Sequence, residues 1–490
     1  MAASQASNER FDQAYQHQQS GDVGLAEAGY RALLADDASH VHSLNNLGVI
    51  CAGQGRLVEA ESYYDAATRL CPQSADFQLN LGNLLAVQGR LGEAAVHFRQ
   101  ALHSRPGDLD LRLLVGAALA AGESPADAVV LLRQVLSARP ESVQAYLSLG
   151  AAHMELTEFD VALACFDRVL DRAPDHALGH FNRAMALLSL GRYREGWREW
   201  EWRWRCRNAY TRTLTRPELR WDGSPLGGQT ILLYAEQGHG DTLQVLRYLP
   251  QVRRTGARVV LRCGRDLKSL VSRCGLADLV IGPDDPLPAF DRHAALMSLP
   301  GLFDTTSETV PEPVRTLAPR SELVEAWRDR LVFPGTLRVG ICWQGNPNHQ
   351  KDSARSVSPE RFVELADVPG VRLVSLQKGA ALPVTSRVHS GSNLVDLGGD
   401  WADFEELAAI VSHLDLVISV DTSVAHLAGS MGKPVWIALP FAADWHWMID
   451  EDASPWYPSA RLFRQPARGD WASVFGRLRD ALAELIRQDG

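Results

Sequence analysis

Cysteines are scarce in this sequence, and nothing in their spacing pairs them. The seven cysteines in 490 residues form no CxxC pair and no even framework. This excludes a small disulfide-stapled scaffold and predicts reduced core or surface thiols. Reduced thiols in turn predict that the protein works in the cytoplasm.

Long apolar runs and an excess of positive charge are also missing. No stretch approaches the ~18 uninterrupted apolar residues that span a bilayer. The first residues, MAASQASNERFDQAYQ, lack the basic start and apolar run of a signal peptide. The net charge of -10 and the pI near 5.9 argue against a general nucleic-acid or membrane-surface binder.

The chain has a repeat of 34 residues. Small residues recur at this interval, as do prolines and large apolar residues: Gly48, Gly82, Gly116 and Gly150; Ala26, Ala60, Ala94, Ala128 and Ala162; Pro72, Pro106, Pro140 and Pro174; Tyr30, Tyr64, Phe98, Leu132 and Phe166. Small side chains let paired helices approach, a large residue fills the space between hairpins, and proline ends the second helix. The pattern resembles the tetratricopeptide repeat (TPR) over residues 9–190. We expect a helical superhelix over 1–190, whose groove holds a peptide.

Asparagine recurs at one equivalent position in the first helix of these hairpins. This position holds Asn46, Asn80 and Asn182, and the intervening hairpins have Leu114 and Ser148 there. Asparagine amides both donate and accept hydrogen bonds, so they suit a peptide backbone in the acceptor-binding groove. Asparagine on a helix also simply faces water, and the broken ladder leaves both interpretations open.

A tryptophan-rich segment follows the repeats. Trp197, Trp200 and Trp204 share one helical face by their spacing. Because soluble proteins rarely expose such a stripe, we expect it to dock the last repeat onto the next domain. Residues 191–228 therefore form a docking helix and linker.

From residue 230 the pattern changes to short apolar runs separated by helices. TILLYAEQ, ARVVLRCG and ADLVIGP predict strands of one unit, and LRVGICWQG, VRLVSLQKG, LDLVISVDT and PVWIALPF predict strands of another. Runs that are apolar on both faces indicate parallel strands buried between helices. The sequence thus predicts an α/β part of two Rossmann-like halves, 229–335 and 336–490, with ligands bound at the strands' carboxyl ends.

Polar residues follow three of these strands. Asp241 lies after a Gly-rich turn, near a helix start around Thr242, as a candidate catalytic base or an ordinary helix cap. His239 competes for the role of base, since a neutral imidazole also accepts a proton. A later loop carries His349, Lys351 and Arg355, which suit a diphosphate or form a solvated surface loop.

The third polar segment follows the strand LDLVISVDT. This strand ends at Asp421, and a helix begins with Thr422 and Ser423, where free N–H groups and hydroxyls favour phosphate. His426 lies one turn on, on the same face as Thr422.

Together, GDTLQ, the GNP…K…RS loop, SLQKG, DTSVAHLAG.MGKPVW and DWHW…SPWYP.ARLFRQ resemble bacterial TPR-linked glycosyltransferases. These are similar to the O-GlcNAc transferase group and to lipopolysaccharide heptosyltransferases, and the resemblance covers essentially the whole chain. It implies a GT-B fold, inversion at the anomeric carbon, a nucleotide-sugar donor, and neither cofactor nor metal. The DxD metal site of GT-A enzymes is missing.

By position, the resemblance implies a role for each matching residue. Asp241 matches the base, and Lys351 and Arg355 match phosphate-binding cations. Gln377 and Lys378 match donor contacts, and Thr422, Ser423 and His426 match the phosphate-binding helix start.

We therefore expect a protein O-glycosyltransferase whose repeats recruit the acceptor. Similarity to flagellin-modifying enzymes suggests flagellin as acceptor and a nonulosonic-acid donor. Two alternatives stay open: a heptosyltransferase-like enzyme with a lipid or saccharide acceptor, and a non-catalytic TPR scaffold with a nucleotide-binding domain.

Overall fold

The computed structural model describes residues 2–120, 124–206, 216–314, 317–347, 349, 351–379, 393–449 and 452–489. The chain divides into two compact units, Met1–His176 and Ala177–Gly490. The division lies inside the 1–190 segment expected as the repeat array, because the last helical hairpin packs with the α/β part. Each unit is described by itself.

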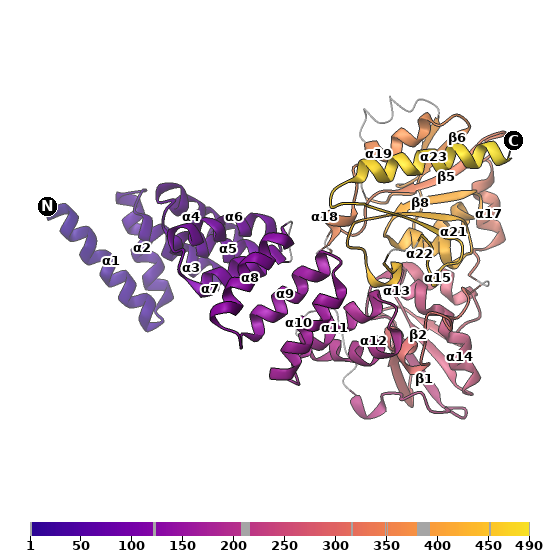
Figure 1. The fold of residues 1–490 in the computed structure, drawn as a ribbon, viewed down its shortest axis with the longest axis horizontal. Helices are drawn as coiled ribbons and strands as arrows, with labels where there is room; N and C mark the ends of the chain where they lie inside the picture. The colour runs from indigo at the N-terminus through magenta and orange to yellow at the C-terminus, as the bar shows by residue number, and fades with distance from the viewer. Residues whose placement is uncertain are drawn as a thin grey trace. The chain divides into compact units, whose positions relative to one another are not determined.

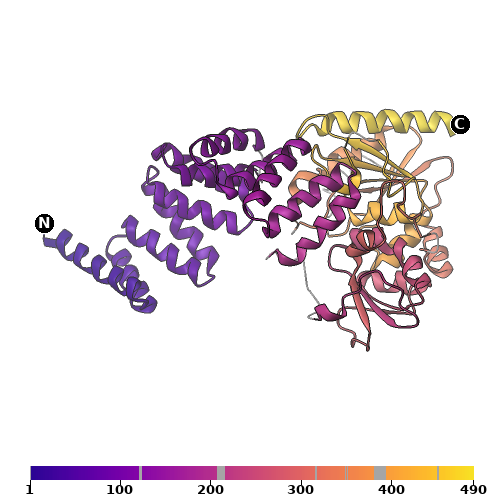
Figure 2. The same cartoon turned by 60° about the horizontal axis from the view of Figure 1, so that its bottom comes forward.

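The first unit is a series of antiparallel helical hairpins (Figures 1 and 2). Its helices are α1 (Ala2–Ser20), α2 (Val23–Asp36), α3 (Val41–Gly53), α4 (Leu57–Leu70), α5 (Ala75–Val87), α6 (Leu91–Ser104), α7 (Leu109–Ala120), α8 (Pro125–Ala138), α9 (Val143–Glu155) and α10 (Phe159–Arg172). The recurrent prolines each stand two residues after the second helix of a hairpin ends, as predicted for a residue that cannot continue a helix.

Within each hairpin the recurrent glycine packs against the recurrent large residue. A Cβ atom added at Gly48 would be 2.5 Å from the Tyr64 ring, and one at Gly82 would be 2.5 Å from the Phe98 ring. The periodic alanines from Ala26 to Ala162 are fully buried. The large residue thus fills the space inside its own hairpin as well as contributing to the contact between hairpins.

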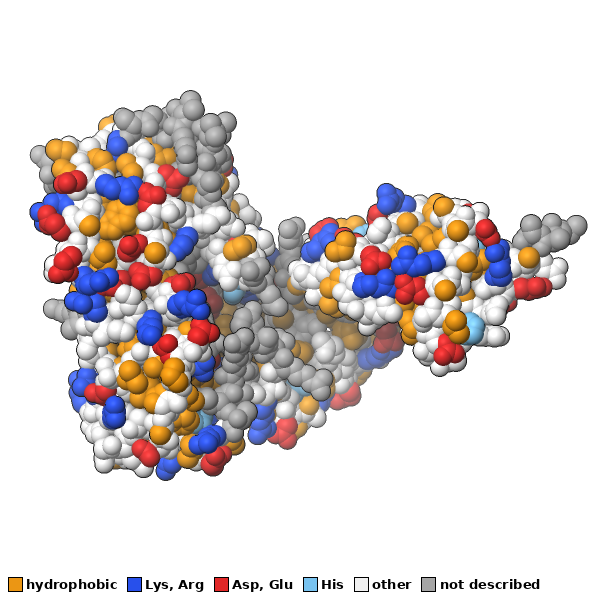
Figure 3. Space-filling view, turned by 180° about the vertical axis from the view of Figure 1, so that it is seen from behind, with side chains coloured by type: hydrophobic (Ala, Val, Ile, Leu, Met, Phe, Trp, Pro, Cys, Tyr) orange, Lys and Arg blue, Asp and Glu red, His pale blue; other side chains and the backbone are white. Residues whose placement is uncertain are grey.

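Ion pairs join successive hairpins. Arg90 binds Glu61 at 2.6 Å, Arg105 binds Asp76 at 2.8 Å, and Arg172 Nε binds Glu141 at 2.6 Å. Figure 3 shows the resulting mixture of blue and red side chains on the hairpins. These pairs are largely exposed, so each contributes little to stability.

The second unit begins with the hairpin α11 (Ala177–Ser189) and α12 (Tyr193–Trp200), continued by the 3₁₀ turn η1 (Glu201–Arg205). Trp197 and Trp200 are buried in a core that also holds Trp445 and Trp456 of the C-terminal half. This confirms the docking role predicted for the tryptophan stripe. Trp204, the third tryptophan of the stripe, is only partly buried and is not part of this core.

The N-terminal half contains a four-stranded parallel sheet in the order β3-β2-β1-β4. Its strands are β1 (Thr230–Tyr234), β2 (Arg258–Arg262), β3 (Leu279–Ile281) and β4 (Arg292–Ala295). Its helical elements are η2 (Pro217–Leu219), α13 (His239–Val245), η3 (Leu246–Tyr248), α14 (Leu249–Arg254), α15 (Arg265–Arg273), η4 (Leu296–Ser298) and α16 (Leu299–Leu302). The next helix, α17 (Ser321–Arg328), packs against α21 (Phe404–Ser412) of the C-terminal half.

The C-terminal half contains a six-stranded parallel sheet in the order β10-β9-β8-β5-β6-β7. Its strands are β5 (Leu337–Cys342), β6 (Val371–Ser375), β7 (Leu394–Asp396), β8 (Leu416–Val420), β9 (Val435–Leu439) and β10 (Ala460–Arg464). Its helical elements are α18 (Asp352–Arg355), α19 (Pro359–Val363), η5 (Glu364–Asp367), α21 (Phe404–Ser412), α22 (Ser423–Ser430), η7 (Trp445–Trp447) and α23 (Trp471–Asp489). All seven predicted strands are present and parallel, which confirms the two Rossmann-like halves.

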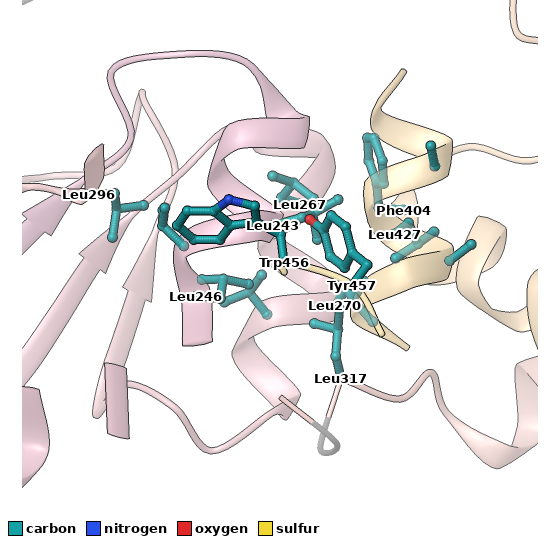
Figure 4. Packing of buried hydrophobic residues seen from close by; sticks show 14 of the residues in the cluster. Leu243, Leu246, Leu267, Leu270, Leu296, Leu317, Phe404, Leu427, Trp456 and Tyr457 are labelled. Atoms are coloured by element: carbon teal, nitrogen blue, oxygen red, sulfur yellow. The ribbon is translucent and has the colours of Figure 1, made fainter. Parts of the chain in front are cut away.

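An apolar core continues from one half to the other. Figure 4 shows Leu243 and Leu246 from the N-terminal half beside Leu427, Trp456 and Tyr457 from the C-terminal half. This packing sets the first turn of α13 against α22.

All seven cysteines are free thiols. Across the described residues, we find no helix with the length and apolar character needed to cross a bilayer.

Candidate active site

Both sheets have a topological switch point, and the polar residues gather there. In the C-terminal half β5 and β8 are neighbours in the sheet. From β5 the chain continues to β6 and β7 on one side, and from β8 it continues to β9 and β10 on the other. In the N-terminal half β1 lies between β2 and β4 in the same way. Ligands of open α/β sheets bind at the carboxyl ends of such strands. The loops after β1, β5 and β8 therefore form the candidate site.

Asp241 lies in the first turn of α13. This helix begins at His239, earlier than the predicted start around Thr242, with Gly238 as its N-cap. The Asp241 Oδ2 atom accepts the Gly238 N–H at 3.1 Å, so the carboxylate supports the helix start. The residue is nevertheless partly exposed toward the C-terminal half.

The first turn of α13 meets α22 without space between them. A Cβ atom at Gly240 would lie 2.6 Å from Cδ2 of His426, so only glycine permits this approach. Gly240 thereby brings Asp241 close to the polar residues that follow β8.

The start of α22 is as predicted. Thr422 is the N-cap, and its hydroxyl accepts the Val424 N–H at 3.2 Å. The same hydroxyl is 2.9 Å from that of Ser419, so it is engaged within the protein. Ser423, the first helical residue, is partly exposed and offers its hydroxyl to the site.

Asp421 is the centre of a buried charged cluster. One of its carboxylate oxygens lies 3.6 Å from Nε2 of His426 and 3.6 Å from Nε2 of His446. The other lies 3.9 Å from the Arg355 guanidinium. His426 is held in place by Tyr457, whose hydroxyl is 2.9 Å from Nδ1.

The cluster moves the pKa values of its members. Burial would raise the pKa of Asp421, but His426 and His446 hold it well below its usual range. Burial lowers the pKa of His426, although Asp421 opposes this shift. For His446 burial is outweighed by Asp421, Asp444 and Asp241, which raise its pKa.

Asp241 belongs to the same electrostatic environment. Its surroundings raise its pKa by desolvation, while His446 and His426 partly offset the shift. A carboxylate with a raised pKa is a stronger proton acceptor than an ordinary aspartate. The arrangement therefore places a candidate base on α13 beside the charged cluster at the start of α22.

The loop after β5 contributes Arg355 from α18. Its guanidinium packs over Gly345 and lies 3.4 Å from Asp352 in addition to its contact with Asp421. Lys351 is exposed, and His349 Nδ1 accepts its backbone N–H at 3.2 Å. Burial lowers the pKa of His349, and Arg355 lowers it further. Arg355 thus lies at the site.

Gln377 and Lys378 already have partners within the protein. The buried Gln377 side chain accepts backbone N–H groups of Trp343 at 3.1 Å and Gln344 at 2.9 Å. Lys378 donates to the Ala402 carbonyl at 2.7 Å and lies 4.3 Å over the Trp401 ring. Both residues therefore support the loops of the site, and a donor contact for either stays a prediction.

His239 faces a different environment from Asp241. Its ring lies at Gly264 and 5.2 Å from Phe404, and its Nε2 is 3.6 Å from Asp266. The structure thus separates the two candidate bases: Asp241 faces the histidine cluster, whereas His239 packs beside α15 and α21.

The asparagines predicted to bind the acceptor lie on α3, α5 and α11. Asn46 donates to the Tyr30 hydroxyl at 2.9 Å, and Asn80 donates to Asn45 at 2.8 Å. Both are partly exposed, and Asn46 Oδ1 accepts from Asn45 at 3.3 Å. Asn182 belongs to the other compact unit and is not part of this network. Peptide binding by all three stays a prediction.

His446 is a site residue that was not predicted from the sequence. It sits in the 3₁₀ turn η7, twenty-five positions after Asp421 in the chain, and both ring nitrogens are buried without a hydrogen-bond partner among the described residues. The DWHW motif could have indicated His446 as a site residue, because it places this histidine between two tryptophans, both of which are buried.

Asp421, His426 and His446 also offer three ligand atoms within 4.8 Å, a spacing that a metal ion can use.

Comparison with known families agrees with this division of the chain. The tetratricopeptide repeat model matches residues 11–75, 72–109 and 149–200. The model of glycosyltransferase family 9 (heptosyltransferase) matches residues 380–445, a segment that contains Asp421, Thr422, Ser423 and His426. The N-terminal part of the chain is thus similar to tetratricopeptide repeats, and a segment of the C-terminal half is similar to family 9 glycosyltransferases.

Individual proteins are also similar to parts of this chain. The chain is 28% identical to Protein FlbA of Caulobacter vibrioides over 368 residues, which are 68% of this chain and 60% of FlbA. It is similar to YrrB, described as a TPR protein with an unusual peptide-binding site, at 20% identity over 35% of this chain and 89% of YrrB, with a TM-score of 0.30. A family 9 glycosyl transferase from Veillonella parvula is matched over its full length and 55% of this chain, at 12% identity and a TM-score of 0.44.

Proposed function

We propose that this protein is an inverting glycosyltransferase that moves a sugar from a nucleotide-sugar donor to a hydroxyl of a protein acceptor. The observation that carries the proposal is the position of Asp241, which faces the Asp421–His426–His446 cluster where the carboxyl ends of both sheets meet. The family 9 segment around Asp421 supports the donor class.

The proposed reaction divides the work between the two halves. The acceptor oxygen forms a bond to the anomeric carbon while the bond from that carbon to the phosphate oxygen breaks. The acceptor proton passes to Asp241, and the electron pair leaves with the phosphate. Arg355, Lys351 and the N-terminus of α22 stabilise the charge that develops on this leaving group.

We assign no metal to the reaction. Arg355 lies 3.9 Å from Asp421, so a fixed cation is already present beside the three groups that might otherwise hold an ion. A second cation in the same place would be repelled by the guanidinium. Transfer that continues in excess chelator would support this assignment.

The repeats supply the acceptor in this proposal. A TPR groove binds extended peptide, and the amides of Asn46 and Asn80 in the first unit would pair with its backbone. Resemblance to flagellin-modifying enzymes makes flagellin our proposed acceptor and a nonulosonic-acid nucleotide our proposed donor.

A second candidate is transfer of a heptose to a saccharide or lipid, because heptosyltransferase is the description of the matching family. A saccharide acceptor has no use for a peptide groove. The two candidates therefore differ in what the repeats are needed for.

Removal of residues 1–176 distinguishes these functions. A thermal-shift screen of nucleotides and nucleotide sugars first identifies the donor, since a ligand at 100 times its dissociation constant adds about 2.7 kcal/mol of stability. We expect the truncated chain to keep donor binding and slow donor hydrolysis but to lose transfer to protein. Retained transfer to a saccharide would favour the heptosyltransferase, and binding without any turnover in the full chain would favour a scaffold.

A further inference from the structure

A cavity lies in the N-terminal half of the α/β part, apart from the site described above. It has a volume of about 260 Å³ and lies between α12–η1 and the strands β1 and β4. None of the Asp241, Asp421 or Arg355 side chains lines it. Its walls are formed by Arg194, Trp197, Arg198, Glu201, Trp204 and Arg220, with Trp221, Tyr234 and the segments 294–298 and 301–304.

The floor of this cavity is aromatic. Trp197 and Trp221 are almost fully buried, and Trp204 is partly exposed. The Trp221 indole donates to the Ser224 carbonyl at 2.8 Å, and the Trp204 indole donates to Glu201 at 3.0 Å. The Trp197 indole N–H is buried with no acceptor among the residues that the structure describes. One donor in the wall is thus left without a partner.

The acidic groups of the cavity are already paired. Glu201 accepts from Arg203 at 2.7 Å and from Ser298 at 2.7 Å, and Asp304 accepts from Arg194 at 2.9 Å. Their negative charge is therefore compensated within the protein.

Two cations of the cavity are not compensated in this way. Arg198 and Arg220 are exposed, and the described part of the chain places no carboxylate within ion-pair distance of either; Arg198 interacts with Glu195 only at longer range. The Arg220 guanidinium lies 5.5 Å over the Trp204 ring, which fixes it above the aromatic floor.

The cavity therefore offers two positive charges that no carboxylate of the protein holds. A carboxylate accepts hydrogen bonds and carries the opposite charge, so it fits these two guanidinium groups. The volume is below the ~300–1,000 Å³ of pockets for drug-sized ligands, which favours one side chain over a nucleotide sugar. Since the whole chain carries a net charge of -10, an acidic partner needs a local cationic site such as this one.

We propose that this cavity anchors an acidic side chain of the acceptor polypeptide through Arg198 and Arg220, next to the residue that is glycosylated. This inference rests on the proposed protein acceptor. The cavity is tied to the candidate site, because Arg203 joins Glu201 and Ser298 in its wall to Glu236, which lies in the loop between β1 and α13, the helix that carries Asp241. An anchored acidic residue would thereby hold a nearby hydroxyl in front of the base.

Fluorescence anisotropy with the full-length chain tests this proposal. The probe is a fluorescein-labelled Ser-Glu-Tyr-Glu-Ser peptide, and its counterpart carries Lys in place of both Glu residues. We expect Arg198→Glu with Arg220→Glu to raise the dissociation constant of the acidic peptide about tenfold or more, because two charge-assisted contacts become repulsive. Arg198→Gln with Arg220→Gln, which keeps both side chains polar, is expected to weaken binding to a smaller extent.

Arg254→Glu is the matched control, because Arg254 is an exposed arginine of the same half outside the cavity. We expect it to leave the affinity within about twofold of wild type. Thermal unfolding curves establish that all variants are folded. Equal binding of the acidic peptide by wild type and by the folded double variants would overturn the proposal, as would equal binding of the lysine peptide. Displacement of the peptide by equimolar glucuronate would reassign the cavity to a sugar and overturn it as well.

Hydrolysis of the nucleotide sugar without peptide is measured in parallel. If peptide binding depends on both arginines but the chain hydrolyses no donor, the result would support the proposed role of the cavity and contradict the proposed transferase activity. Normal hydrolysis with arginine-independent peptide binding would contradict the cavity alone.

Discussion

The Nε2 atom of His446 lies 3.6 Å from the Asp421 carboxylate, and both side chains are buried. The two residues come from different loops at the carboxyl edge of the sheet, after β8 and after β9. His446 also has a raised pKa because Asp421, Asp444 and Asp241 outweigh the effect of burial. In its protonated form it is a cation directed at the centre of the site.

Replacement of His446 by glutamine removes this cation and keeps the approximate size of the side chain. We expect weaker donor binding by about 10- to 100-fold, since a charge-assisted interaction is worth about 1.5–3 kcal/mol. Isothermal titration with the nucleotide sugar measures the change. His413→Gln is the control, because this histidine bonds to the Val324 carbonyl outside the site. Equal losses in both variants would show a general packing defect instead.

Arg355→Ala tests the contact with the donor phosphates. We expect a rise of about 10- to 100-fold in the dissociation constant and a lower turnover, because a charge-assisted contact to phosphate is lost. Arg355→Lys is expected to restore part of the affinity, since lysine keeps the charge but not the planar fork. Arg479→Ala, which changes an exposed arginine on α23, serves as the control in the same titration. Wild-type affinity in Arg355→Ala would show that Arg355 only neutralises Asp421 and Asp352.

Glu236 makes the stability of the α/β unit depend on pH. Burial raises its pKa from the ordinary 4.5 to about 7, against the opposing effect of Arg203. Between these values the folded state holds a proton that the unfolded state has released, so stability falls as pH rises from about 4.5 to about 7.

Glu236→Gln should remove this dependence. As the pH rises from about 4.5 to about 7, we expect the free energy of unfolding of the variant to increase relative to that of wild type by on the order of 2–3 kcal/mol. Above pH 7 the difference between the two proteins should stay constant. Urea unfolding at several pH values measures the difference, with the exposed Glu322→Gln as control. A constant difference between wild type and Glu236→Gln from pH 4.5 to 8 would contradict the raised pKa.

Much of the fold follows from local pattern. The contact between Gly82 and Phe98 repeats in every central hairpin, so one period of 34 residues predicts the whole array. Strands such as β8 are apolar on both faces and stand out from their surroundings. The strands β4, β7 and β10 escaped prediction because they are short or carry charged residues, as in Arg292–Ala295 and Ala460–Arg464.

The site was predictable in part, because some of its contacts depend on the tertiary structure. Asp241, Arg355 and Asp421 follow strands and were placed by the rule that loops at carboxyl ends meet. His446 comes from a 3₁₀ turn far along the chain, and no periodicity connects it to Asp421. For Gln377 the sequence leaves two roles open. A polar residue after a strand can bind a ligand, but it can also bind the backbone of the neighbouring loop, as Gln377 does at Trp343 and Gln344.

The most direct test is the turnover of Asp241→Asn, measured beside donor binding and beside His239→Ala. The amide keeps the size of the carboxylate but cannot take the acceptor proton. We predict a loss of about 10²- to 10⁴-fold in turnover with nearly unchanged donor affinity, while His239→Ala stays active. In the wild type, activity should fall as pH falls through the raised pKa of Asp241. Near-full turnover of Asp241→Asn would contradict the account and leave Asp241 only its bond to Gly238 at the start of α13.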